Sequence, residues 1–484
     1  RPYLLPNVTN ILVNTSGPYC PIQLHGYQET ALLCWENSGF KGIFEMATGT
    51  GKTYTALAAA VNRYQQNGRL ALIILVPYLH LLEQWAQNCR DFGFNPVLCS
   101  SEHGKWQIEV KTRIQDYKIG AISNLCLLAV HKTASSSRFH NAIVRLDPAQ
   151  TMIIGDEVHG LGSPELRKAM TDRADLRLGL SATPRRWYDE SGTEAIFSYF
   201  GKTCFEFSLE EAIGKYLTPY RYYPQLVSLT DDEVSYYEQL TSLINALTKN
   251  SKKDPRYDEA ILKLLIKRTA IISSAQGKLP AAFSLLNSII ESNKLNQIET
   301  RDLLVYCAPG NHLEILQAVA SLGIRCHEFV HRVSLSNREK ILDQFAKGDI
   351  QALVAIKCLD EGVDVPSTRT AIIMASSTNP REFIQRRGRI LRLAKGKSEA
   401  TIYDYIVVPP EDRWSLKKDT DISILRREMP RFVEFASSAL NEFQARSCVR
   451  EILDYYEMLN LLDEKPWDIY HNLKQWDWDI DEQT

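Results

Sequence analysis

Residues 45–53 read Glu-Met-Ala-Thr-Gly-Thr-Gly-Lys-Thr and lie between a short apolar run, residues 42–44, and a helix-like stretch. A strand, a glycine-rich loop and a helix that begins at Gly-Lys-Thr form a typical cradle for phosphate groups. The glycines let backbone N–H groups turn toward phosphate oxygens, and the helix N-terminus adds positive potential. In such a cradle Lys52 contacts the β- and γ-phosphates and the Thr53 hydroxyl ligates Mg²⁺.

The expected phosphate-binding residues of this loop are Thr48, Gly49, Thr50, Gly51, Lys52 and Thr53. Met46 stands where the strict pattern has a glycine, so a glycine-rich turn without a ligand is the alternative interpretation.

A second motif supplies carboxylates. Residues 152–159 read Met-Ile-Ile-Gly-Asp-Glu-Val-His, which places two acids at the end of a buried strand. Ligands of open parallel sheets bind outside the carboxyl ends of the strands. Asp156 suits a role in holding Mg²⁺, and Glu157 suits that of the general base that activates water. A solvated acidic strand end is the alternative, which the phosphate loop upstream makes less favourable.

Strand-like apolar runs alternate with longer amphipathic stretches along the chain. Such an alternation indicates parallel sheets covered on both faces. The runs fall into two groups, one before about residue 210 and one after about residue 300. They are residues 70–76, 152–155, 176–180, 303–306, 352–356, 371–374 and 401–408.

We therefore expect an α/β protein with two doubly wound parallel sheets and four segments. These are an N-terminal flank with the first sheet domain (1–217), a helical linker (218–296), the second sheet domain (297–410) and a helical C-terminal extension (411–484). Within the linker, residues 229–295 have a helical pattern. The extension contains Trp414, Trp467, Trp476 and Trp478, which we interpret as helix-packing residues, with base stacking as the alternative.

Composition sets further limits. A chain of 484 residues is too long for one ordinary core. Its formal net charge of -2 means that any attraction to nucleic acid must be local.

The ten cysteines form no C-x-x-C pair, so we expect free thiols in the cytoplasm and no zinc or iron–sulfur site. No apolar run is long enough for a membrane span. The chain begins at Arg1, and we expect the natural protein to extend upstream.

Further motifs follow in a recognisable order. Residues 156–159 form a DExH box, residues 180–184 read Leu-Ser-Ala-Thr-Pro, and residues 385–392 read Gln-Arg-Arg-Gly-Arg-Ile-Leu-Arg. From roughly residue 20 to 410 this set resembles the superfamily 2 helicases. The resemblance implies two RecA-like domains, hydrolysis of ATP with Mg²⁺, and movement along nucleic acid. Residues 82–85 and 207–213 are similar to those of XPB-like DNA helicases and of translocases from prokaryotic restriction and phage-defence systems.

The resemblance also implies roles for single residues. Gln28 would hydrogen-bond adenine, while Gly362 and Asp364 would contact the nucleotide from the second domain. Arg389 and Arg392 would be arginine fingers that stabilise the transferring phosphoryl group. On a helix these two arginines lie on one face, which Arg386 also approaches.

The resemblance also implies how hydrolysis is coupled to movement. His159 and Gln385 would couple the site of the attacking water to closure of the two domains, and Ser181 and Thr183 would link that site to nucleic acid. Candidate contacts to the nucleic-acid backbone are Pro77, Tyr78, Lys132, Arg185 and Lys357. Such contacts make binding salt-sensitive and largely independent of sequence. For the basic candidates, an ordinary surface charge is the alternative.

Three functions stay open at this point. The first is an ATP-dependent DNA helicase or translocase that moves along DNA. Its partner would be a nuclease domain or a nuclease subunit. The second is an RNA- or double-strand-sensing DExH ATPase. The third is an ATP-regulated scaffold that binds nucleic acid, which the intact Lys52, Asp156, Glu157, Arg389 and Arg392 make less favourable. No nuclease-type metal cluster is visible in the sequence.

Overall fold

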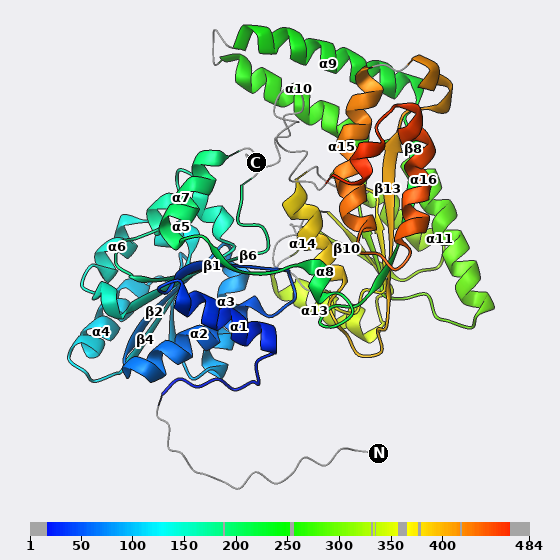
Figure 1. Ribbon diagram of the computed structural model, residues 1–484. Coiled ribbons are helices and arrows are strands. Elements are labelled where there is room, and N and C mark those ends of the chain that lie inside the picture. Colours follow the sequence, from blue (N-terminus) through cyan, green and yellow to red (C-terminus); the bar gives the residue numbers. More distant parts are fainter. Residues whose placement is uncertain are drawn as a thin grey trace. The chain divides into compact units, whose positions relative to one another are not determined.

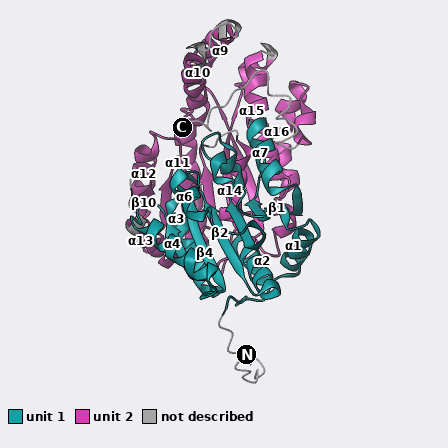
Figure 2. Ribbon diagram, turned by 90° about the vertical axis from the view of Figure 1, so that its left-hand side faces the viewer, with its two compact units in different colours: residues 1–46, 51–207 teal, residues 47–50, 208–484 magenta. Residues whose placement is uncertain are grey.

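The computed structural model describes residues 17–186, 189–251, 256–330, 333, 335–356, 365–375, 379–416 and 419–464. The chain forms two compact units, one of residues 1–46 and 51–207 and one of residues 208–484 with residues 47–50 (Figure 2). Each unit contains one sheet, and all neighbouring strands described in these sheets are parallel (Figure 1). The expected fold class of two parallel-sheet α/β domains is confirmed.

The first unit has a seven-stranded sheet with the order β3-β4-β2-β5-β6-β1-β7. Its central strands are apolar throughout because both faces of the sheet are covered. The elements are α1 (Gly26–Asn37), β1 (Lys41–Met46), α2 (Lys52–Asn67), β2 (Leu70–Val76), α3 (Leu79–Asp91), β3 (Pro96–Cys99), α4 (Trp106–Lys118), β4 (Asn124–Val130), α5 (His131–Ala134), α6 (Ser137–Ile143), β5 (Thr151–Asp156), β6 (Leu176–Ser181), α7 (Glu190–Phe200) and β7 (Thr203–Phe207).

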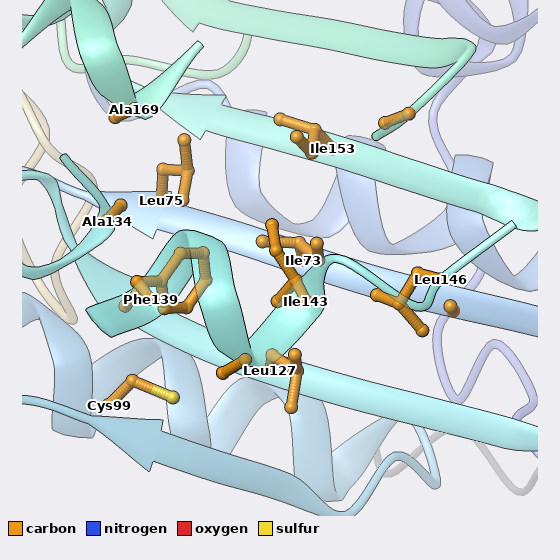
Figure 3. Close-up of a cluster of buried hydrophobic side chains, with 14 of the residues drawn as sticks. Ile73, Leu75, Cys99, Leu127, Ala134, Phe139, Ile143, Leu146, Ile153 and Ala169 are labelled. Carbon is orange, nitrogen blue, oxygen red and sulfur yellow. The ribbon is translucent and has the colours of Figure 1, made fainter. Parts of the chain in front are cut away.

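One face of this sheet packs against α4, α6 and α7. Ile73 of β2, Leu127 of β4 and Ile153 of β5 point into the same cluster as Phe139 and Ile143 of α6 (Figure 3). Helices α2 and α3 contact the strands but contribute no side chain to this cluster. Because successive strand residues point to opposite faces, α2 and α3 cover the other face.

The second unit has a six-stranded sheet with the order β10-β11-β9-β12-β13-β8. Helices α11 and α12 form the core of one face with the strands. The elements are α8 (Leu209–Ala212), β8 (Tyr220–Ser228), α9 (Asp231–Ser251), α10 (Arg256–Ser273), α11 (Lys278–Leu295), β9 (Leu303–Tyr306), α12 (His312–Ser321), β10 (Cys326–Phe329), α13 (Leu335–Lys347), β11 (Ala352–Ala355), β12 (Thr370–Ile373), α14 (Pro380–Ile390), β13 (Ala400–Val408), α15 (Asp419–Ala436) and α16 (Glu442–Tyr455).

The segment expected as a helical linker, residues 218–296, is helical only in part. Helices α9, α10 and α11 follow the expected pattern, but β8 at its start is an edge strand of the second sheet and pairs with β13. The sequence did not indicate this strand because it lacks an apolar run and contains Pro224, which is tolerated at a sheet edge.

The C-terminal segment is helical up to α16, as expected, and it packs on the second sheet. Arg431 of α15 pairs with Asp404 of β13 at 3.0 Å, and both side chains are buried. Trp414 donates a hydrogen bond to the Pro409 carbonyl and packs against Tyr455, which agrees with a packing role. The other three tail tryptophans, Trp467, Trp476 and Trp478, lie outside the described residues. Among the helices that the structure describes, none has the length and apolar content of a membrane span.

Candidate functional site

The glycine-rich loop joins the end of β1 to the start of α2. Gly49 and Gly51 have φ angles of 89° and 79°, a left-handed conformation that favours glycine and turns N–H groups toward a common point. Lys52 is the first residue of α2, Thr53 the second, and the Lys52 ammonium donates to the Met46 carbonyl at 3.0 Å. Backbone N–H groups, an ammonium and a hydroxyl at a helix N-terminus form a donor set that fits the phosphates of a nucleotide.

Gln28 lies beside this loop and is buried in the first turn of α1. Its Oε1 accepts from the His25 backbone N–H at 2.9 Å, and its Nε2 donates to Thr55 Oγ1 at 3.0 Å. A Cβ atom at Gly51 would come within 2.9 Å of Gln28 Nε2. The carboxamide is therefore held against the phosphate loop in one orientation.

Asp156 ends β5 and is surrounded by donors. Its Oδ2 accepts from the indole nitrogen of Trp85 at 2.8 Å, and its Oδ1 accepts from the backbone N–H of Glu157 at 3.0 Å. Burial raises the pKa of Asp156 to about 6, and the charge of Glu157 adds to this, while the Trp85 hydrogen bond and Lys52 oppose it. A buried carboxylate held this way beside a cation suits a hydrated Mg²⁺.

His131 supports the same strand end. Its Nε2 lies 3.1 Å from the backbone oxygen of Asp156, and burial lowers the pKa of the imidazole to about 4. The neighbouring Lys132 is exposed. His131 therefore has a structural role. Lys132, the other basic residue after β4, is exposed and accessible to a nucleic acid.

Glu157 has a φ of 45°, a rare conformation for a residue with a side chain. Strain of this kind concentrates at functional sites. His159 Nδ1 lies 3.4 Å from Glu157 Oε2 and 3.3 Å from Ser181 Oγ, and Ser181 Oγ accepts from the Thr183 backbone N–H at 3.1 Å. The structure thus brings the candidate base Glu157 together with His159, Ser181 and Thr183, three of the four residues expected to link hydrolysis to the track.

The arginine motif of the second unit lies on and after α14. Arg389 is in this helix and Gln385 one turn before it, but α14 ends at Ile390, so Arg392 lies in the following turn. The expectation that one helix carries both arginines is therefore wrong, although the Arg392 N–H donates to the Arg389 carbonyl at 3.4 Å. The turn is fixed by the buried Lys397, whose ammonium donates to the Ile390 and Arg392 carbonyls.

Arg386 and Arg387, the other two arginines of this motif, contact residues of the second unit. Arg386 donates to the Ala375 carbonyl at 3.1 Å and lies over the Tyr306 ring. Arg387 is 1% exposed and binds both the carboxylate and the carbonyl of Glu434 in α15. These contacts assign Arg386 and Arg387 to the support of α14. Lys397 and Glu434 were missed because only tertiary contacts reveal them.

The described track candidates gather at one edge of the first sheet. Pro77 and the exposed Tyr78 follow β2, Lys132 follows β4, and the exposed Arg185 follows β6. Strands β2 and β6 flank β5, so Pro77, Tyr78 and Arg185 follow the strands next to the carboxylates of the site, whereas β4, before Lys132, lies one strand further away. The remaining predicted residues Lys357, Gly362 and Asp364 lie outside the described residues.

Comparisons with known sequences agree with the two-unit organisation. Residues 21–186 match the family described as type III restriction enzyme, res subunit, and residues 282–394 match the helicase conserved C-terminal domain. The DNA 3′-5′ translocase XPB2 of Sulfurisphaera tokodaii is 28% identical over 395 residues, which cover 80% of this chain and 82% of that protein. The DNA 3′-5′ helicase XPB of Mycobacterium tuberculosis is 25% identical, over 79% of this chain and 60% of that protein.

Two solved structures share the fold. The type ISP restriction-modification enzyme LlaBIII, which is ATP-dependent and bound to DNA, has a TM-score of 0.57 at 17% identity, over 95% of this chain and 33% of that enzyme. The helicase domain of Pyrococcus furiosus Hef has a TM-score of 0.51 at 18% identity, over 82% of this chain and 98% of that domain. The chain spans about a third of the restriction enzyme, and at these identities the likeness shows the fold alone.

Proposed function

We propose that this chain, which belongs to the superfamily 2 helicases, uses its ATP hydrolysis to move along DNA. The observation that supports the proposal is the cluster at the ends of β1, β5 and β6, where Lys52 at the start of α2, Asp156 and the Glu157–His159–Ser181 chain of contacts belong to the first unit. The lysine proposed to bind phosphate, the carboxylate proposed to hold the metal and Glu157, whose backbone is strained, lie at the same end of this sheet as the residues proposed to contact nucleic acid.

Each residue has a role in this proposal. Bound ATP with Mg²⁺ supplies the phosphoryl group that is transferred to water. Lys52 neutralises the phosphates, Thr53 and Asp156 hold the metal, and Glu157 takes the proton from the attacking water. Arg389 and Arg392 of the second unit supply permanent positive charge for the transferring group.

His159 and Ser181 would carry the signal between hydrolysis and grip. His159 contacts both the proposed base and Ser181, and Ser181 holds the backbone of Thr183 just before the exposed Arg185. A change at the base can therefore reach the residues proposed to contact nucleic acid through the Glu157–His159 contact and the two hydrogen bonds of Ser181. We infer that grip on the backbone alternates with hydrolysis through this connection.

DNA is favoured as the track because the named relatives are DNA helicases and translocases. The match to the res subunit of type III restriction enzymes supports a role beside a nuclease in a prokaryotic restriction or antiviral system. RNA is the competing track, since the same phosphate loop and carboxylates would serve it equally.

The test is the ATPase activity of the full chain with single-stranded DNA, duplex DNA and RNA of matched length. We expect strong stimulation by DNA, and stimulation by RNA alone would refute the DNA track. Glu157→Gln is the control, because it should keep ATP binding and lose turnover. Unchanged turnover in this variant would exclude Glu157 as the base.

A further inference from the structure

The backbone after β5 forms a 3₁₀ helix, Val158–Gly162, which follows Glu157. We call residues 157–162 the DExH turn. Glu157 opens this turn with its φ of 45°, and backbone strain of this kind persists only where the surrounding structure holds it in place. Among the residues that the structure describes, Arg167 and Arg186 from later segments donate to carbonyls of the turn. These two arginines are therefore candidates for the support of the proposed base.

Arg186 holds the middle of the DExH turn. Its Nη1 donates to the His159 carbonyl at 2.6 Å, and its Nε donates to Asp189 Oδ2 at 2.7 Å. Its backbone N–H donates to Thr193 Oγ1 at 2.9 Å. The side chain of Arg186 is 12% exposed, whereas the preceding Arg185 is an exposed residue. Of these two adjacent arginines, Arg186 thus contacts the DExH turn, and Arg185 is accessible to solvent.

Asp189 anchors the Arg186 guanidinium. It is the N-cap of α7, and its Oδ1 accepts from the Gly192 backbone N–H at 2.7 Å. Although burial acts to raise it, the pKa of Asp189 is held below its usual value by the Gly192 N–H and by Arg186. The carboxylate is therefore ionised at neutral pH, and a charged pair makes stronger hydrogen bonds than a neutral one. Arg186 is thus tied to the start of α7, a helix that contacts the DExH turn.

Two glycines leave room for the Arg186 side chain. A Cβ atom at Gly162, the last residue of the DExH turn, would lie 2.5 Å from Arg186 Cδ, and one at Gly192 would lie 2.7 Å from the same atom. The arginine therefore passes between two positions that have no side chain. Arg167 holds the end of the turn, because its Nε donates to the Gly162 carbonyl and its Nη2 to Ser191 Oγ, both at 2.7 Å. The DExH turn is thus fixed at two points to the first turn of α7.

We propose that Arg186 is a positioning residue for hydrolysis, which fixes the DExH turn through the His159 carbonyl and so keeps Glu157 aligned with the attacking water. The inference rests on the proposed role of Glu157 as the general base. A positioning role is favoured over a contact with nucleic acid, because the guanidinium donates to a carbonyl and a carboxylate of its own unit. A general base must lie within hydrogen-bond reach of the proton that it takes, so a displaced turn lowers turnover even when ATP is bound.

The test is the basal ATPase of the full chain without nucleic acid. Arg186→Gln should lower kcat about 10- to 100-fold and leave the KM for ATP within about threefold. Arg177→Gln is the matched control, because Arg177 is a half-buried arginine of the same unit that donates to the Ala174 and Tyr199 carbonyls, at 2.8 and 3.2 Å. A general loss of stability would affect both variants alike, whereas a loss of alignment should lower kcat in Arg186→Gln alone.

Two further variants keep a positive charge at position 186. Arg186→Lys retains one donor group but cannot reproduce the planar fork, so its kcat should lie between those of the wild type and Arg186→Gln. Gly192→Ala leaves the arginine in place and favours α7 as a helix, but its new methyl group must displace the Arg186 side chain. It should lower kcat about tenfold at an unchanged KM, and it decides the question if Arg186→Gln does not fold.

The possible failures can be told apart. A lower kcat in Arg186→Gln and Gly192→Ala, with Arg177→Gln unchanged, supports the positioning role, and a wild-type kcat in the first two overturns it. A normal basal kcat with weaker stimulation by DNA also overturns it, because Arg186 would then act at the nucleic acid. The proposed base is judged separately by Glu157→Gln. If that variant retains turnover, the assignment of the base fails, and this inference fails with it.

Discussion

Trp85 donates a hydrogen bond to the Oδ2 atom of Asp156 at 2.8 Å, and this contact joins α3 to the end of β5. Trp85 is 2% exposed, so the donor is held by packing and cannot turn to water. The carboxylate that we propose as a Mg²⁺ ligand is thus oriented by a residue with no charge. A change at the start of α3, beside Tyr78, can reach the metal site through this bond.

Trp85→Phe should keep the ring packing and remove the hydrogen bond to Asp156. Loss of a group that orients a metal ligand typically weakens metal binding 10- to 100-fold, so we expect half-maximal ATPase at about tenfold higher Mg²⁺. A Mg²⁺ titration of the ATPase rate measures this. Trp35→Phe is the matched control, because buried Trp35 donates to the Arg177 carbonyl away from the site. Equal Mg²⁺ dependence in both variants would contradict the role of Trp85.

Glu45→Gln should stabilise the protein more at pH 8 than at pH 5. Burial raises the pKa of Glu45 to about 7, and Glu206 adds to this. The folded protein therefore binds the proton more tightly than the unfolded chain, whose glutamate titrates near 4.5. This contribution to stability is full below pH 4.5 and is lost as the pH rises through 7.

Because Glu45 is partly exposed, the gain at pH 8 should be on the order of 1 kcal/mol. Chemical unfolding at both pH values measures it. Glu194→Gln, which removes an exposed acid of α7, should show no such pH dependence. The prediction fails if the free energy gained by Glu45→Gln is the same at pH 5 and pH 8.

Ser181→Ala should separate hydrolysis from the track. It removes the hydrogen bonds of Ser181 Oγ with His159 and with the Thr183 backbone. Basal ATPase should stay within about threefold, while stimulation by DNA falls about tenfold or more. Ser100→Ala is the control, since Ser100 Oγ also pairs with a histidine, His103, at 2.8 Å. Equal stimulation in the two variants would remove Ser181 from the coupling path.

Arg387→Met should destabilise the second unit. The guanidinium is buried against Glu434 and donates to the Tyr220 hydroxyl at 3.2 Å. Removing one partner of a buried pair typically costs 3–5 kcal/mol, and we expect about 3 kcal/mol because Glu434 is partly exposed. Urea unfolding of the full chain measures the loss. Arg426→Met, at an exposed position of α15, should be neutral, and similar losses for both would rule out the assigned role.

The sequence predicts most of the interior strands, because strands buried on both faces have uninterrupted apolar runs, although the interior strand β4 was not among the expected runs. Strands β2, β5, β6, β9, β12 and β13 occur at the expected positions within two residues. Strand β8 was missed because an edge strand buries one face only, so its aromatic residues alternate with polar ones. The same limitation concealed β10, whose residues are mostly half-exposed.

The phosphate loop and the DExH box could be predicted because their chemistry depends on residues adjacent in the chain. The support around them could not, because it comes from distant segments. Trp85 is 71 residues from Asp156, and Glu434 is 47 residues from Arg387. Nothing in the arginine motif distinguishes Arg387, which faces inward, from Arg389. Only tertiary packing separates them.

Helix α15 closes the second sheet with charged side chains, and this limits how the protein can be shortened. The match to the helicase conserved C-terminal domain ends at residue 394, before α15 begins. A fragment that stops there would lack β13 and would leave Arg387 without Glu434, and one that stops after β13 would also leave Asp404 without Arg431. A fusion protein that takes up the second half of this chain should therefore retain it at least through α15, since the smallest portable piece is larger than its signature motifs.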